Sequence, residues 1–216
     1  MKKVIYIFDA YCPWCYAFTP VVKRLYDNYG HSFAFEVLSG GMIVGDQIKT
    51  IGGTQDSENL RKSYQHIAER TGARFGEAFF QRIQDEETVM NSEIPATALA
   101  VFRELATGHP PIDFVHQMLS FLFLEGRNPN DTDFYKELAV RFELDPELFV
   151  INMEKESFQQ QARYDFFLAK QLQATAFPRL YLQTSETYFH LIAKGFSDYE
   201  RIVQIIETIM TDEATI

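Results

Sequence analysis

The chain has 216 residues, of which 46% are hydrophobic and 15% aromatic, enough apolar side chain for a sizeable core without disulfide staples. Its formal net charge of −10 repels phosphate backbones and anionic lipids, so we expect neither nucleic acid nor a membrane surface as a partner. The first apolar stretch, Val4–Phe8, is shorter than that of a secretory signal peptide, and we therefore expect a cytoplasmic protein.

The first predicted element is a buried central strand, Lys3–Phe8, because nearly every residue in it is β-branched or aromatic. A helix then starts at Pro13, which suits the first helical turn because its missing N–H costs nothing there. Pro20 lies inside this helix and should kink it. A second strand, Phe33–Leu38, follows.

The middle of the chain is predicted to be almost entirely helical, because apolar residues recur there at helical spacing. The expected helices are Asp56–Arg70, Glu77–Gln84, Pro95–Ala106, Ile112–Leu124, Thr132–Phe142, Pro146–Met153 and Ser157–Gln173.

Strand patterns return near the end as a predicted hairpin of Arg179–Gln183 and Tyr188–Lys194, followed by a last helix. This order predicts an α/β protein with a thioredoxin-like fold: a four-stranded mixed sheet carrying a large all-helical insertion. The first two strands, joined through a helix, should be parallel. We expect residues 1–50 and 166–216 to form the thioredoxin-like domain and residues 51–165 the helical insertion.

The chain has two cysteines, Cys12 and Cys15, and their position indicates redox chemistry. Cys12 lies between a buried strand and the start of a helix, where backbone N–H groups and the helix dipole should lower the pKa of its thiol. Cys15 follows one turn later and should lie deeper. We therefore expect Cys12 to form a mixed disulfide with the substrate and Cys15 to resolve it.

Three other uses of the cysteine pair compete with this one. A zinc site needs about four ligands, and neither a second CxxC nor a closely spaced histidine pair accompanies the motif. A purely structural disulfide closing so short a loop would remove little chain entropy. The third alternative is that both cysteines are ordinary buried thiols without a redox function. We expect neither a metal nor a tightly held cofactor.

The motif Cys12-Pro13-Trp14-Cys15, the internal Pro20 and the later Ala176-Phe177-Pro178 resemble the DsbA-like branch of the thioredoxin superfamily, particularly its cytosolic dithiol oxidoreductases. The resemblance implies that Phe177–Pro178 is a cis peptide beside Cys12. It also implies that the backbone of Phe177 pairs with an extended substrate. The best-known strongly oxidising relatives carry Pro-His between their cysteines, so Pro13-Trp14 indicates a less oxidising pair.

Three further positions near the motif remain open in function. Trp14 is either an aromatic side chain packed on the helix end or a platform that faces the substrate. Asp9 is either an acid/base group for proton transfer from Cys15 or a residue that organises the turn. The glycines of Ser39-Gly40-Gly41 either form a plain turn or allow a substrate to approach the backbone.

The leading prediction is a thiol–disulfide oxidoreductase acting on disulfide- or thiol-containing proteins or peptides, with glutathione as a further candidate partner. A glutathione-dependent isomerase or transferase of the kappa-like class is the second reading, although such relatives generally use a single serine or cysteine. A non-enzymatic thioredoxin-fold adaptor or redox sensor is the third.

Overall fold

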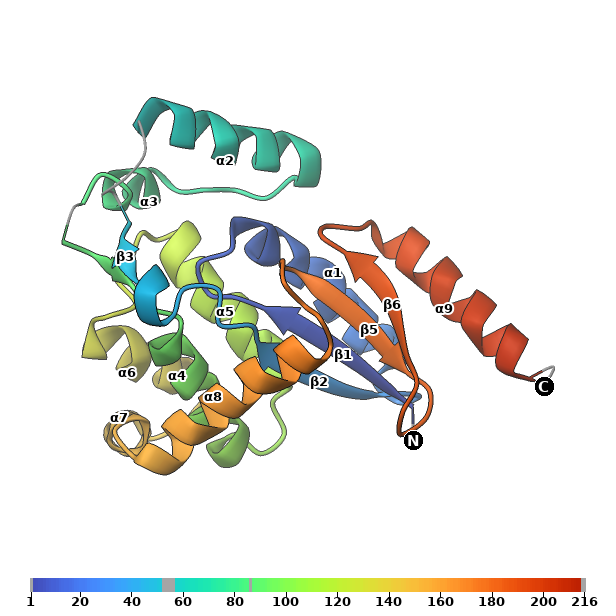
Figure 1. Cartoon of the computed structure of the whole chain (residues 1–216). Helices are drawn as coiled ribbons and strands as arrows, with labels where there is room; N and C mark the ends of the chain where they lie inside the picture. Colours follow the sequence, from blue (N-terminus) through green and yellow to red (C-terminus); the bar gives the residue numbers. More distant parts are fainter. Residues whose placement is uncertain (1, 52–56, 86, 215–216) are drawn as a thin grey trace.

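A computed structural model describes residues 2–51, 57–85 and 87–214 of the chain (Figure 1). Asp56, the first residue of one expected helix, lies outside these ranges. Within them, no helix is both long enough and apolar enough to span a bilayer.

The centre of the fold is a four-stranded mixed sheet in the order β2-β1-β5-β6. Its strands are β1 (Lys3–Phe8), β2 (Ala34–Ser39), β5 (Arg179–Gln183) and β6 (Phe189–Lys194). β1 pairs in parallel with β2 and antiparallel with β5, which in turn pairs antiparallel with β6. The predicted mixed sheet, the parallel first pair and the late hairpin are therefore confirmed.

Side chains alternate along each strand, so each face of the sheet has its own set of side chains and packs against its own helices. Tyr6 and its neighbours on one face join the main core with helices α1 (Pro13–Tyr29) and α9 (Tyr199–Ala214). Ile7 and Tyr181, on the other face, belong to a smaller cluster beneath helix α8 (Glu156–Gln171). β1 is buried along almost its whole length, as a central strand between two layers of helices should be.

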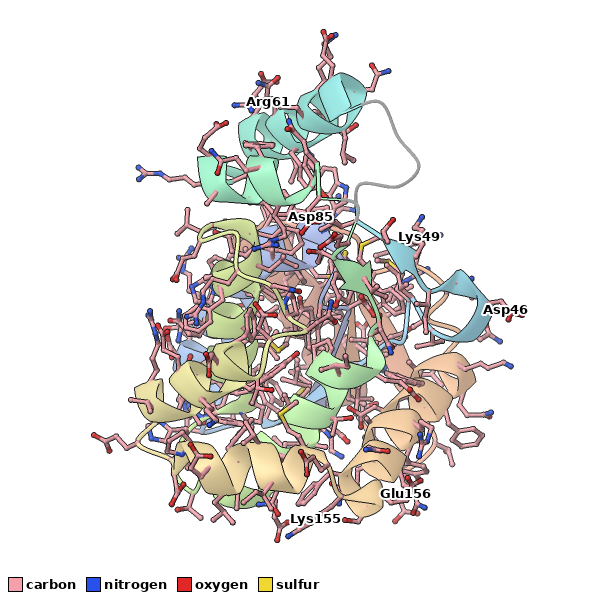
Figure 2. All side chains as sticks on the ribbon, turned by 90° about the vertical axis from the view of Figure 1, so that its left-hand side faces the viewer. Asp46, Lys49, Arg61, Asp85, Lys155 and Glu156 are labelled. Atoms are coloured by element: carbon pink, nitrogen blue, oxygen red, sulfur yellow. The ribbon has the colours of Figure 1, made fainter. Side chains whose placement is uncertain are left out.

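The remaining helices form a block beside the β2 edge of the sheet (Figure 1). They are α2 (Ser57–Thr71), α3 (Glu77–Arg82), α4 (Glu93–Leu105), α5 (Pro111–Phe123), α6 (Thr132–Arg141) and α7 (Pro146–Met153). Figure 2 shows Arg61 of α2 at one end of the molecule and Lys155 and Glu156, before and at the start of α8, at the other.

Local sequence explains why several of these helices begin where they do. Asp145 caps α7 by accepting hydrogen bonds from the N–H groups of Glu147 and Leu148, and Pro146 occupies its first turn. Pro111 likewise occupies the first turn of α5, although no described side chain caps that helix. The predicted helical character of this part of the chain is confirmed, with small shifts at the ends.

One small sheet was not predicted. Strand β3 (Lys49–Thr50) pairs antiparallel with β4 (Val89–Met90). A short 3-10 helix, η1 (Gly45–Gln47), precedes β3, and Figure 2 shows Asp46 and Lys49 projecting outward there. Strands of two residues are too short to show a periodic pattern in the sequence. The division into residues 1–50, 51–165 and 166–216 stays a prediction.

Candidate active site

Both cysteines lie at the junction between the central strand and the first helix. After β1 ends, a short turn leads to Cys12, which is the N-cap residue of α1 in an extended conformation with φ −93° and ψ 108°. Its sulfur accepts a hydrogen bond from the backbone N–H of Cys15 at 3.2 Å. The side chain thus occupies the capping position that an oxygen of Ser or Asp usually takes, where negative charge is stabilised.

The two sulfurs differ in burial. Both residues are free cysteines; Cys15 is 0% exposed and Cys12 is 4% exposed. Burial raises the pKa of the Cys15 thiol well above its ordinary value, and the neighbouring Cys12 sulfur raises it further. Cys15 lies deeper than Cys12, as expected, and is held as a neutral thiol at neutral pH.

A second segment reaches Cys12 from the far end of the chain. The Phe177–Pro178 peptide bond is cis, and the Cys12 thiol donates to the Phe177 carbonyl oxygen at 3.6 Å. The N–H of Gly195 donates to the Pro178 carbonyl at 2.9 Å, which ties the segment to the end of β6. The structure therefore brings Cys12, Phe177 and Pro178 together.

Gly40 makes room for the Phe177 ring. A Cβ atom on Gly40 would lie only 2.1 Å from that ring, so any side chain there would force the ring to move. Gly41 adopts a φ of +67°, and a Cβ there would meet the ring of Phe166 at 2.8 Å. The two glycines thus accommodate aromatic side chains of the protein itself. Sequence reasoning missed this role, because the neighbouring residues do not reveal that Phe177 and Phe166, far along the chain, pack against the glycines.

Asp9 is a buried carboxylate that organises the turn before Cys12. It is 1% exposed, and it accepts hydrogen bonds from the N–H of Tyr11 at 3.0 Å and of Met42 at 2.7 Å. Burial raises its pKa, because these hydrogen bonds only partly offset the loss of water. The charge of Asp9 also raises the pKa of Cys15, so the two groups interact.

The two residues between the cysteines are half-buried at the start of α1. Pro13 occupies the first turn. The Trp14 ring packs edge-on against the exposed His66 of α2, with ring centroids 6.5 Å apart. Trp14 therefore packs on a neighbouring helix while part of its ring stays open to solvent.

A small cavity of about 180 Å³ borders the turn before Cys12. Tyr11, Met42 and Tyr64 line it together with other, mainly apolar, side chains. Burial and the nearby Cys12 sulfur both raise the pKa of Tyr64. Sequence reasoning did not single out Tyr64, which reaches the site from α2 and is one of many aromatic residues in the chain.

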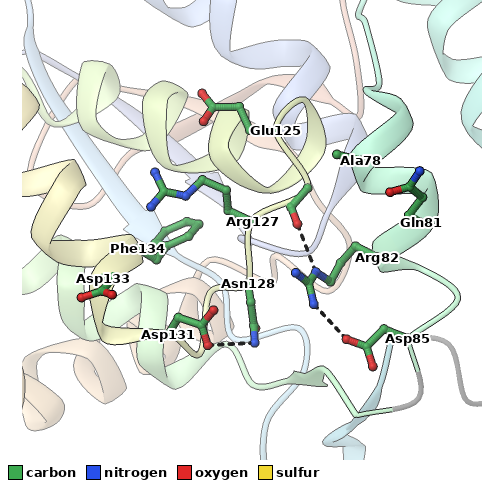
Figure 3. Close-up of a pocket in the computed structure, with 11 residues that line it drawn as sticks. Ala78, Gln81, Arg82, Asp85, Glu125, Arg127, Asn128, Asp131, Asp133 and Phe134 are labelled. Atoms are coloured by element: carbon green, nitrogen blue, oxygen red, sulfur yellow. Dashed lines mark hydrogen bonds and ion pairs between the residues drawn. The ribbon is translucent and has the colours of Figure 1, made fainter.

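A larger hollow of about 550 Å³ lies in the helical block, and neither cysteine lines it (Figure 3). Arg82 at its wall donates to the Gly126 carbonyl and pairs with Asp85, and Asn128 bonds Asp131. Its polar groups therefore largely satisfy one another. Across the described ranges, no group of three or more His, Cys, Asp and Glu side chains is placed to hold a metal ion.

Comparison with known proteins gives consistent matches over nearly the whole chain. A family model for the DSBA-like thioredoxin domain matches residues 3–206. The ClpXP adapter protein SpxH of Bacillus subtilis (strain 168) is 24% identical over 212 residues, which cover 97% of this chain and 68% of SpxH.

Among solved structures, a candidate protein disulfide isomerase from Nitrosomonas europaea superposes with a TM-score of 0.83 at 18% identity and 98% coverage of both chains. The cytosolic disulfide reductase DsbM from Pseudomonas aeruginosa has a TM-score of 0.78 at 20% identity, covering 97% of this chain and 98% of DsbM. The structure of DsbM with GSH has a TM-score of 0.75 at 19% identity, covering 97% and 99%. At these identities the likeness establishes a shared fold.

Proposed function

The chain belongs to the DSBA-like thioredoxin domain family, and we propose that it is a thiol–disulfide oxidoreductase whose working pair is Cys12 and Cys15. One observation carries the proposal. The Cys12 sulfur lies between the N–H of Cys15, at 3.2 Å, and the carbonyl of Phe177, at 3.6 Å. An N–H group in this position favours a thiolate at the start of the helix, and the carbonyl belongs to the cis Phe177–Pro178 segment just before β5, which a substrate backbone would join.

The proposed reaction has two steps. The Cys12 thiolate attacks one sulfur of a substrate disulfide, so that a mixed disulfide forms and the other substrate sulfur leaves as a thiolate and takes up a proton. The Cys15 thiolate then attacks the Cys12 sulfur, forming the Cys12–Cys15 disulfide and releasing the second substrate sulfur. Two electrons pass from the protein dithiol to the substrate, and the reverse order oxidises a dithiol.

The second step needs a proton acceptor, because burial keeps Cys15 in its thiol form. We assign this role to Asp9, whose carboxylate interacts electrostatically with Cys15 and has a pKa raised by burial. A carboxylate with a raised pKa is a stronger base than an exposed one. The hydrogen bonds from Tyr11 and Met42 fix its orientation.

The substrate is proposed to be an extended, disulfide- or thiol-containing protein or peptide. Its backbone would run beside Phe177 and Pro178, while Pro13 and the open part of the Trp14 ring would face its side chains. The structure of the cytosolic DsbM with GSH supports glutathione as a candidate partner and the cytoplasm as the location.

The proposal is tested by following the reduction of a peptide disulfide with glutathione as the electron donor. We expect Cys12→Ser to reduce turnover to the uncatalysed rate, because no mixed disulfide can form. We expect Cys15→Ser to accumulate a mixed disulfide at Cys12, detectable as an added mass that a reductant removes. Turnover retained by Cys12→Ser would contradict the proposal.

A second candidate function is that of a protein adaptor. It is favoured by the similarity to SpxH, which extends over 97% of the chain. An adaptor holds its partner through its surface and does not require either thiol. Binding to ClpXP can be measured by surface plasmon resonance with the native protein and with the Cys12→Ser, Cys15→Ser double variant. Equal binding by both, without turnover of disulfides by the native protein, would favour the adaptor.

A further inference from the structure

A third cavity, of about 450 Å³, lies on the α8 side of the sheet, between the C-terminal end of α8 and strands β5 and β6. Helix α8 covers the β1–β2 half of this face, and Figure 1 shows β5 and β6 extending beyond it. Gln171 and Gln173 line one wall of the cavity. Arg179, Tyr181, Leu191 and Lys194 are among the residues that line the other.

Arg179 is a buried cation without a counter-charge. Only 6% of the residue is exposed, and its Nε donates to the Ala176 carbonyl at 2.9 Å. Among the residues that the structure describes, no carboxylate pairs with its guanidinium. Arg103, by contrast, is paired with the buried Asp165 at 2.6 Å. Within the described residues, the two terminal nitrogens of the guanidinium make no hydrogen bond, and they are not fully enclosed, so they are donors that an anion can reach through the cavity.

The cavity is also lined by a second cation and by exposed apolar side chains. Lys194 lies directly opposite Arg179 in the β5–β6 ladder and, within the described ranges, makes no ion pair. Leu191 and Phe189 line the same cavity with 46% and 37% of their surfaces exposed. The Tyr181 hydroxyl already donates to the Leu172 carbonyl at 2.7 Å, so it is not the free donor here.

We propose that this cavity binds a carboxylate carried on an apolar body, with Arg179 and Lys194 holding the carboxylate and Leu191 and Phe189 contacting the apolar part. The planar guanidinium matches a carboxylate through parallel N–H···O bonds, and Lys194 adds a point charge. This chemistry is shared by small organic acids and by the C-terminus of a peptide that ends in an apolar residue. Neither thiol is needed, so the proposal stands apart from the redox function.

The site is tested by NMR titration of the full chain, following the Nε–H resonance of Arg179 and the backbone amide of Gly195. The probes are hexanoate, for a free organic acid, and N-acetyl-leucine, for a peptide C-terminus. N-acetyl-leucinamide keeps the apolar body without the charge, and inorganic phosphate supplies charge without the apolar body. Whichever carboxylate binds more tightly identifies the source.

Variants separate the site from general electrostatics. Lys194→Gln changes an exposed residue and tests the site even if Arg179→Gln fails to fold. Lys170→Gln removes the same charge from an exposed position of α8 that does not line the cavity, and it is the matched control. We expect about tenfold or more weaker carboxylate binding in the Lys194 and Arg179 variants and unchanged binding in Lys170→Gln.

The expected result is saturable binding of a carboxylate probe by the native chain and by Cys12→Ser alike, with N-acetyl-leucinamide and phosphate much weaker. Equal binding of N-acetyl-leucinamide would show an apolar groove, and equal binding of phosphate would show an unselective anion site. Either result, or the absence of saturable binding by both carboxylates, would overturn the proposal.

Discussion

At the scale of single residues, the candidate site depends on unequal environments for chemically similar groups. The Cys12 sulfur receives the N–H of Cys15 and faces the Phe177 carbonyl, whereas Cys15 is fully enclosed. Asp9 is enclosed as well, and its hydrogen bonds come from backbone N–H groups. The turn between β1 and α1 places the three residues, and Phe177 and Met42 from other parts of the chain complete the environments of Cys12 and Asp9.

The buried Asp9 predicts a measurable pH dependence of stability. Its pKa in the folded protein is raised above the ordinary value of 3.8, so the folded state binds this proton more tightly than the unfolded chain. The associated stability is fully present below 3.8 and is lost as the pH rises through the folded pKa. We therefore expect the free energy of unfolding of the native protein, relative to Asp9→Asn, to fall as the pH rises above about 4.

Urea unfolding at a series of pH values measures this difference. Asp27→Asn makes the same chemical change at an exposed position of α1 and serves as the control. The prediction fails if the difference between the native protein and Asp9→Asn is constant, or rises, over this pH range. The same Asp9→Asn variant should lower the pKa of Cys15, because the Asp9 charge raises it.

Sequence reasoning reached some of these residues and not others. Cys12 and Cys15 stand out because their spacing and their position after an apolar strand are both local features. Gly40 does not, because its role is set by the Phe177 ring, which comes from the far end of the chain. The hydrogen bond from Met42 to Asp9 was equally out of reach, since it depends on how the segment after β2 folds back, whereas the bond from Tyr11 is local and fits the turn role considered for Asp9.

At the scale of elements, α1 shows how the chain tolerates a proline inside a helix. Pro20 has no N–H to donate to the carbonyl four residues earlier, that of Tyr16. The Thr19 hydroxyl donates to that carbonyl instead, at 2.9 Å. The Thr19 oxygen also lies 2.7 Å from Nδ1 of His116 on α5, so one side chain both repairs α1 and joins it to its neighbour.

Thr19→Val should therefore destabilise the protein, because it keeps the shape of the side chain and leaves the Tyr16 carbonyl without its donor. The site is buried, so we expect a loss of about 1–3 kcal/mol in the free energy of unfolding. Denaturant unfolding of the native protein and the variant measures this cost.

A double-mutant cycle identifies the cause. In Pro20→Ala, the backbone N–H that the substitution restores can donate to the Tyr16 carbonyl, while the contact between Thr19 and His116 is unchanged. Thr19→Val should then cost less in the Pro20→Ala background than in the native one. An equal cost in both backgrounds would contradict the proposed repair and assign the effect to His116.

Most helices and strands could be predicted because their hydrophobic patterns are long and because capping residues or prolines mark their ends. The strands at Lys3–Phe8 and Arg179–Gln183 have the predicted bounds, and so does the helix Pro146–Met153 with its Asp145 cap. β3 and β4 could not be predicted, because each has two residues and their pairing joins segments far apart in the sequence.

At the scale of the whole molecule, an ion pair between a buried carboxylate and a half-buried arginine joins the helical block to the sheet. Asp165 of α8 is 4% exposed and accepts hydrogen bonds from the two terminal guanidinium nitrogens of Arg103 on α4, at 2.6 and 3.1 Å. Asp165 also accepts the N–H of Ser39, and Arg103 donates to the Val37 carbonyl. The pair thereby satisfies backbone groups on β2, which is an edge strand of the sheet.

Arg103→Met should be strongly destabilising, because it leaves the Asp165 carboxylate buried without its cation. We expect a loss of about 3–5 kcal/mol in the free energy of unfolding. Arg163→Met is the matched control, since Arg163 of α8 pairs at the surface with Glu93 of α4, across the same two helices, and with Glu156 of its own helix. These exposed pairs should each contribute less than about 1 kcal/mol. Similar losses in the two variants would contradict the structural role of the pair between Arg103 and Asp165.

The overall architecture could be predicted from the sequence, but the side-chain contacts that join its parts could not. The order of strands and helices indicated a four-stranded mixed sheet with a helical block, and both are present. Arg103 and Asp165 gave no signal, because their partners are backbone groups of a distant strand. One continuous core runs from Tyr6 of the sheet to Phe114 and Phe149 of the helical block.

The central claim is that Cys12 and Cys15 form a working redox couple, and its most direct test is a redox titration. The purified protein is equilibrated in glutathione buffers of graded potential, free thiols are trapped by alkylation, and the oxidised fraction is read by mass. We predict one reversible two-electron transition in which both thiols are lost together, and no such transition in Cys12→Ser. Cysteines that stay reduced and unreactive across the whole range would contradict the claim.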